Sequence, residues 1–182
     1  LTTGSDGSIY IAGWTEGDLD GQTNSGNKDA SIQKLIDAKR FDTQAPTLES
    51  FALSASTVDT SSSDATITLS LELKDDLSGI DSDNSYVAFY SPSNEQEIYG
   101  WLSNDKRISG TSTHGFYETE ITIPKFSEAG FWEISDYSFR LADEVGNDDH
   151  PSADELTSAG FPTGFTVSGE ADTQAPTLES FA

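Results

Sequence analysis

The sequence predicts an all-β protein whose main part is an antiparallel β-sandwich. Apolar and polar residues alternate with a period of two in several segments, turn-forming residues separate these segments, and helical spacing occurs over one short stretch. Of the 182 residues, 34% are hydrophobic and 10% are aromatic, which is enough for a packed core. The acidic composition therefore does not indicate a disordered chain.

The clearest alternation runs over residues 66–74, where four aliphatic side chains share one face: Ile67, Leu69, Leu71 and Leu73. Residues 117–123 follow the same pattern, and Tyr137, Phe139 and Leu141 repeat it. Each of these segments is expected to form a half-buried strand.

Weaker strand signals occur in four further segments: residues 47–53, 85–91, 97–102 and 165–168. Residues 152–159 predict a short helix, because Ser152 and Glu155 have the spacing of a capping box. About seven strands separated by turns favour an immunoglobulin-like sandwich. A jelly roll is the alternative fold.

An exact internal repeat sets the expected domain boundaries. The segment Asp42–Ala52 reads DTQAPTLESFA, and Asp172–Ala182 has the same eleven residues. We therefore expect one complete repeat over residues 42–171, with residues 172–182 beginning the next identical repeat. Residues 1–41 are richer in Gly, Asp and Asn and are expected to belong to a different unit. The chain is thus expected to be a piece of a tandem array.

Acidic residues concentrate in three stretches that such a sandwich brings together. The segment before the first strand and two of the loops lie at one end of the domain. Clustered carboxylates repel one another unless a cation lies between them, and Ca²⁺ takes about six to eight oxygen ligands from flexible loops. We expect a Ca²⁺ site there, and its candidate ligands are Asp42, Asp75, Asp76, Asp81, Asp143, Asn147 and Asp148. The alternative is that these side chains are solvated or stabilise turns.

Two short motifs within the repeat suggest a family. Residues 75–79 read D-D-L-S-G, and residues 143–147 read D-E-V-G-N. The unit resembles the bacterial immunoglobulin-like tandem repeats of large surface proteins and secreted adhesins, in which strands end in such turns. The resemblance implies an extracellular or cell-surface stalk or spacer, with a role in cell adhesion. It further implies contacts with neighbouring repeats of the same chain and, in many members, bound calcium.

Residues 1–41 resemble a second family. The stretch Gly4–Gly21, followed by residues 26–35, is similar to the bacterial β-propeller repeat known as SBBP. This resemblance implies a partial β-propeller blade before the sandwich. Asp18, Asp20 and Asn24 have a spacing that suits a second Ca²⁺ site, with a plain Asx turn as the alternative.

Composition excludes several classes of function. Lys and Arg number 9 against 32 Asp and Glu, so the formal net charge is −23 and the basic surface needed for nucleic-acid binding is missing. No apolar run approaches the roughly 18 residues of a membrane-spanning helix, so no membrane insertion is expected. The chain has no Cys, which excludes a disulfide framework and a thiol nucleophile.

An enzyme is not expected either. The sequence contains no nucleophile elbow, P-loop or H-E-x-x-H motif. His114 and His150 do not have a metal-binding spacing. Glu118 and Glu120 share one strand face like a glycosidase pair, but a solvated strand face explains them. Part of a secreted glycan-active enzyme is the weakest of the functional alternatives.

The stronger alternative is a carbohydrate-binding module. Trp101 and Tyr99 are candidate glycan contacts, because aromatic rings provide a flat apolar surface. Trp132 and Tyr137 are expected in the core instead. Solvent exposure of Trp101 together with a tyrosine neighbour would favour the carbohydrate-binding alternative.

Overall fold

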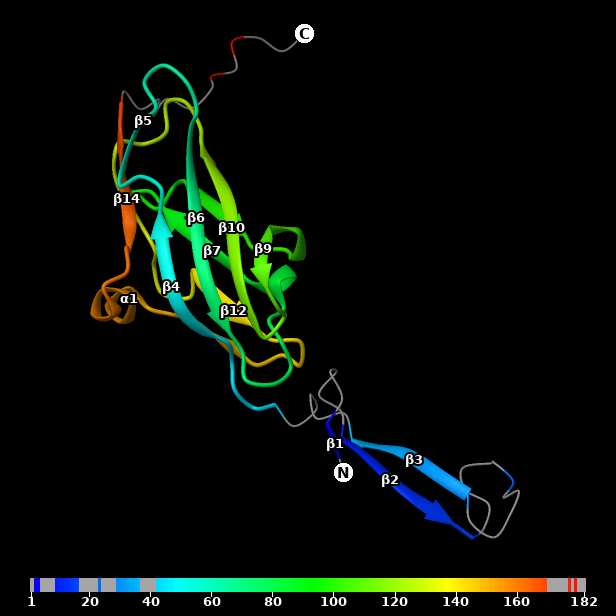
Figure 1. Cartoon of the computed structure of the whole chain (residues 1–182). Helices are drawn as coiled ribbons and strands as arrows, with labels where there is room; N and C mark the ends of the chain where they lie inside the picture. Colours follow the sequence, from blue (N-terminus) through cyan, green and yellow to red (C-terminus); the bar gives the residue numbers. More distant parts are fainter. Residues whose placement is uncertain are drawn as a thin grey trace.

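A computed structural model describes residues 2–3, 9–16, 23, 29–36, 42–169, 177 and 179. Residues 42–169 form two β-sheets packed face to face, with one short helix at the side (Figure 1). The prediction of an all-β sandwich is confirmed. No helix in the described part of the chain is long and apolar enough to cross a membrane.

The first sheet has four strands in the order β4 (Thr47–Leu53), β6 (Ala65–Lys74), β10 (His114–Ile123) and β9 (Arg107–Gly110). Strands β6 and β10 are antiparallel along their whole length, from Ala65 opposite Ile123 to Lys74 opposite His114. Exposed and buried residues alternate strictly along β10. The period-two pattern in the sequence therefore reports a sheet with one face on the core.

The second sheet is built around β7 (Tyr86–Tyr90). One edge of β7 pairs with β8 (Glu97–Trp101), and the other pairs in succession with β12 (Phe139–Ala142) and β11 (Gly130–Glu133). Strand β14 (Gly164–Ser168) adds to β11 and runs parallel to β5 (Thr57–Asp59). The two-residue strand β13 (Asp148–Asp149) pairs with β12.

This strand order is that of an immunoglobulin-like sandwich. In chain order, β4, β6, β9 and β10 occupy the places of strands A, B, D and E in one sheet. Strand β7, the broken strand formed by β11 and β12, and β14 occupy the places of C, F and G in the other. The strands at β5, β9, β11 and β13 were not predicted, because two to four residues are too few to show a period.

Short helical turns complete the domain. Helix α1 (Ala153–Ala159) begins with the predicted capping box, in which Ser152 and Glu155 bond each other's backbone, and it ends at Gly160 in the left-handed conformation. Two 3₁₀ turns, η2 (Ser82–Asn84) and η3 (Asn104–Lys106), flank β7 and β8.

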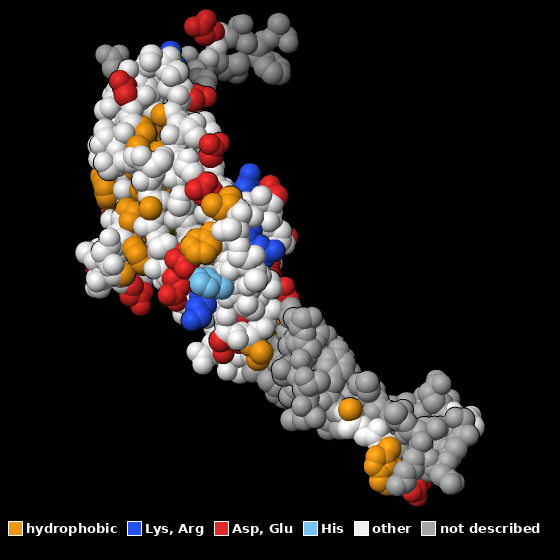
Figure 2. Space-filling model, viewed as in Figure 1, with side chains coloured by type: hydrophobic (Ala, Val, Ile, Leu, Met, Phe, Trp, Pro, Cys, Tyr) orange, Lys and Arg blue, Asp and Glu red, His pale blue; other side chains and the backbone are white. Residues whose placement is uncertain are grey.

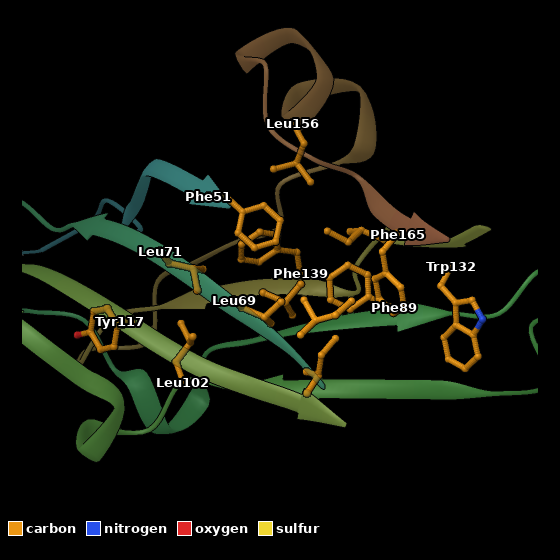
Figure 3. Packing of buried hydrophobic residues seen from close by; sticks show 14 of the residues in the cluster. Phe51, Leu69, Leu71, Phe89, Leu102, Tyr117, Trp132, Phe139, Leu156 and Phe165 are labelled. Carbon is orange, nitrogen blue, oxygen red and sulfur yellow. The ribbon is translucent and has the colours of Figure 1, made fainter. Parts of the chain in front are cut away.

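The core lies between the two sheets, and Figure 3 shows its large side chains interleaved. Trp132 is buried as predicted, and its indole Nε1 donates to Glu128 O at 2.8 Å. The prediction for Tyr137 is wrong, because this residue is 76% exposed. Its φ of 63° places it in the turn that separates β11 from β12.

Residues 2–36 contribute a small separate sheet of β1 (Thr2–Thr3), β2 (Ile9–Thr15) and β3 (Asp29–Ile36). Strands β2 and β3 are antiparallel, with Gly13 opposite Ser31. In the residues described, this sheet has three strands, against the four of a propeller blade. The predicted second Ca²⁺ ligands, Asp18, Asp20 and Asn24, lie outside the described residues.

Candidate metal centre

Three aspartates at one end of the sandwich form a compact group. Asp42 lies in the segment before β4, Asp75 directly follows β6, and Asp143 directly follows β12. One carboxylate oxygen from each lies within 4.8 Å of the others. The three residues are nearly shielded from solvent, with exposed fractions of 8%, 4% and 1% in that order.

Backbone contacts hold the two loops of this group against each other. Ile80 and Asp143 form an isolated antiparallel bridge. The N–H of Glu144 donates to the carbonyl of Gly79 at 2.9 Å. Asp75 and Asp143 therefore stay close because their loops are paired like strands.

The segment before β4 is attached to the same loops through its aspartate. The carboxylate of Asp42 accepts the N–H of Ser78 at 2.7 Å and that of Gln44 at 3.1 Å. Burial alone would raise the pKa of Asp42, but these hydrogen bonds leave its pKa below the ordinary value. Asp42 is thus held as a carboxylate that joins the linker to the loop after β6.

The buried charge of Asp75 is less well compensated by hydrogen bonds than that of Asp42. Its Oδ2 accepts the N–H groups of Gly79 at 2.6 Å and Leu77 at 3.0 Å, while its buried Oδ1 has no hydrogen-bond partner. Burial raises the pKa of Asp75 above its ordinary value, against these hydrogen bonds and with a further contribution from the charges of Asp42 and Asp143. An unpartnered buried carboxylate oxygen is the kind of atom that a bound cation stabilises.

Asp143 organises its own turn. Its Oδ2 accepts the side-chain amide of Asn147 at 2.6 Å. Its Oδ1 accepts three consecutive backbone N–H groups, those of Val145, Gly146 and Asn147. Gly146 has a φ of 96°, a value that favours glycine and lets the chain wrap around the carboxylate. The motifs at residues 75–79 and 143–147 therefore share one feature: an aspartate directly after a strand accepts hydrogen bonds from the backbone of the turn that follows.

The group suits a calcium ion in size and chemistry. Carboxylate oxygens lie about 2.3–2.6 Å from Ca²⁺, so two ligands of one ion are separated by at most about 5 Å. The three oxygens lie within 4.8 Å of one another, which is compatible with this condition. Among the described residues, the ion pairs formed by Lys, Arg and His involve other acids. No basic side chain within the described part of the chain therefore forms an ion pair with these three carboxylates.

Three of the seven predicted metal ligands form the buried group, and the other four are not members of it. Asp76 is exposed, although its side chain lies near enough to Asp42 to help lower the pKa of that residue, and Asp81 caps η2 by accepting from Asn84. Asn147 donates its amide to Asp143, so it positions that ligand. Asp148 is exposed and pairs with Arg140 at 3.0 Å.

The alternation of buried and exposed residues in the strands contained a signal that Asp75 and Asp143 are buried. Asp75 continues the inward phase that buries Leu71 and Leu73, and Asp143 continues the phase that buries Phe139 and Leu141. Asp76, with the opposite parity, faces solvent. An acid that extends the buried face of a strand by one step is carried into the domain, and an acid next to it is not.

The predicted glycan contacts lie elsewhere, on the outer side of β8. Trp101 is 51% exposed and Tyr99 is 37% exposed, and their rings are nearly parallel with centroids 5.8 Å apart. Tyr86 packs against both rings and was not predicted. Its position opposite Trp101 depends on the register of β7 and β8, which the sequence does not specify.

Comparison with known proteins gives one match. Residues 46–169 match a family described as a domain of unknown function (DUF7034). The chain belongs to this family. The DUF7034 match extends across both sheets and includes Asp75 and Asp143, whereas Asp42 lies shortly before it. No curated protein and no solved structure matches the chain.

Proposed function

We propose that this domain is a calcium-clamped structural repeat, in which one ion joins the segment before β4 to the loops after β6 and β12. The role is that of a non-catalytic stalk or spacer in a large secreted or cell-surface protein. The observation that carries the proposal is the buried group of Asp42, Asp75 and Asp143, with Asp75 Oδ1 left without a partner.

The position of Asp42 supports a role at the junction between units. This residue precedes the first strand of the sandwich and begins the repeated sequence DTQAPTLESFA. Asp172 begins the second copy, so the following unit would have its own linker aspartate. Pro46 follows Asp42 by four residues and restricts the backbone there. An ion at each junction would keep successive units extended.

Heat unfolding of the whole chain tests the proposal. Addition of Ca²⁺ at about 5–10 mM, in the range of extracellular sites, should raise the melting temperature above its value in chelator. A ligand that binds only the folded state stabilises it by about 2.7 kcal/mol at a hundredfold excess over its Kd. The same concentration of Mg²⁺ should have a smaller effect, because Mg²⁺ retains its water ligands.

Matched variants locate the ion. Asp42→Asn and Asp143→Asn should each remove most of the calcium response, because each deletes one anionic ligand. Asp148→Asn changes an exposed acid that pairs with Arg140, and it should keep the calcium response. A melting temperature that does not respond to Ca²⁺, or a response that all three variants lose equally, would contradict the proposal.

A further inference from the structure

The outer face of the second sheet carries a cluster of aromatic side chains, here called the aromatic platform: the half-buried Tyr86 and the exposed Tyr99 and Trp101. Val87 and Phe89 point into the core, so the intervening residues of β7 point outward. Tyr86 lies opposite Trp101 in the register of β7 and β8. The platform is therefore a feature of two paired strands, and no loop conformation has to form it.

The rings support one another. The centroid of Tyr86 lies 5.0 Å from that of Trp101 and 5.6 Å from that of Tyr99. Between them on the same face, Ala88 lies opposite Tyr99 and is fully buried. This small side chain leaves room for the rings to cover it. The platform is thus fixed by packing while Trp101 remains half exposed.

We propose that the aromatic platform binds a neutral polysaccharide, with Trp101 and Tyr99 stacked against the apolar faces of its sugar rings. The two rings are nearly parallel, with an interplanar angle of 17°, and they project from alternate positions of one strand. Two rings placed two residues apart along β8 suit an extended chain of repeating sugar units.

Polar groups beside the platform supply hydrogen bonds to sugar hydroxyls. Glu97 lies two residues before Tyr99 on the same face of β8, and its carboxylate accepts a hydrogen bond from the Tyr99 hydroxyl at 3.3 Å. Arg140 lies opposite Tyr86 on β12, where its guanidinium is held by Asp148 at 3.0 Å. Hydrogen bonding with Tyr90, burial and the charge of Glu97 raise the pKa of Tyr99 to about 12. Its hydroxyl therefore remains protonated over the physiological range.

Charge selects a neutral partner over an anionic one. The chain carries a formal net charge of −23, and Figure 2 shows acidic side chains on the side of the first sheet, opposite the platform. An acidic polysaccharide would be repelled by this field, whereas a neutral one would not. Arg140, which lies beside the platform, already forms an ion pair with Asp148.

Affinity electrophoresis of the whole chain tests the proposal. Native gels would contain hydroxyethyl cellulose, xyloglucan, galactomannan or dextran as neutral probes, with alginate as the anionic probe. At least one neutral polysaccharide should retard the protein, and alginate should not. Trp101→Ala should weaken this retardation by about tenfold or more, which corresponds to 1.4 kcal/mol, and Tyr99→Ala should also weaken it.

Phe116→Ala is the matched control, because Phe116 is a comparably exposed aromatic residue on β10 in the other sheet. This variant should bind as the unmodified chain does, and melting temperatures would show that all variants are folded. Lack of retardation by every neutral probe, retardation by alginate alone, or equal loss in Phe116→Ala would overturn the proposal. So would a dimer in solution that Trp101→Ala dissociates without any polysaccharide binding, because the platform would then be an interface between two copies. None of these outcomes depends on calcium, so the proposed clamp is tested separately.

Discussion

Asp75 shows at the scale of one residue why a cation would stabilise this fold. Its carboxylate is buried beside two others, and only one of its oxygens is hydrogen-bonded. Burial and the neighbouring charges raise its pKa, which means that its ionised form is disfavoured in the ion-free domain. A bound Ca²⁺ would favour the ionised form, so the Asp75 carboxylate would then stabilise the folded domain.

Asp75→Asn should therefore have opposite effects with and without calcium. In chelator the variant should be more stable than the original chain at pH 7, by about 1–3 kcal/mol, the typical cost of a buried polar group without a partner. The asparagine oxygen can still accept from Leu77 and Gly79. In Ca²⁺ the variant should be the less stable of the two. Chemical denaturation under both conditions measures this, and a variant that is destabilised in chelator would contradict the electrostatic explanation.

The pH dependence should follow the same logic. A carboxylate whose folded pKa is raised contributes stability fully below its unfolded pKa, near 3.8, and loses it as the pH rises through the folded value. In calcium-free buffer, the deficit of the original chain relative to Asp75→Asn should shrink as the pH falls from 7 toward about 4. Below that pH, protonation of Asp42, whose pKa is lowered, should destabilise both proteins. A difference that is constant across this range would mean that Asp75 does not titrate as inferred.

At the scale of elements, the turn after β12 couples folding to the metal site. Gly146 has a φ of 96° and donates its N–H to Asp143, and no atom would block an added methyl group. Gly160, which ends α1, has a φ of 78° and the same open surroundings. The two glycines therefore face a similar backbone constraint, one in the turn that binds Asp143 and one at the end of α1.

Gly146→Ala and Gly160→Ala should each lower stability in chelator by about 1–3 kcal/mol, because alanine disfavours a positive φ. Only Gly146→Ala should also reduce the affinity for Ca²⁺, since it strains the turn that positions Asp143. Isothermal titration calorimetry with CaCl₂ distinguishes the two variants. Equal affinities in both would show that this turn does not set the geometry of the site.

Long and regular elements could be predicted from the sequence, and short or irregular ones could not. The alternation in β6 and β10 and the capping box of α1 are local signals, and the structure confirms them. The burial of Tyr137 was wrongly predicted, because a turn breaks the strand between Ile134 and Phe139. Ser135 and Asp136 are residue types that favour a turn, and this local signal was outweighed by the alternation of Tyr137, Phe139 and Leu141.

The candidate site was predictable in its location and only partly in its members. The immunoglobulin-like order of strands implies that the loops after β6 and β12 meet at one end, together with the segment before β4. To distinguish the buried Asp75 from the exposed Asp76, the alternation of buried and exposed residues in β6 has to be extended one residue past the end of the strand. The packing of Tyr86 on Trp101 required the register of two strands, which no single segment encodes.

At the scale of the whole molecule, the clamp would join parts of the chain that are distant in sequence. Asp42 and Asp143 are 101 residues apart in the sequence, and both reach the loop that follows β6. An ion among them would close the sandwich at the end where the preceding segment enters. The aromatic platform lies on the outer face of β7 and β8 and would remain available in an extended array.

The most direct test is a crystal structure of the whole chain grown with Ca²⁺, with Tb³⁺ exchanged for it to provide anomalous scattering. The clamp predicts a strong anomalous peak about 2.3–2.6 Å from carboxylate oxygens of Asp42, Asp75 and Asp143, lost in crystals of Asp75→Asn. A chain that binds no ion there, or binds it only at exposed acids such as Asp76 and Asp148, would contradict the calcium clamp.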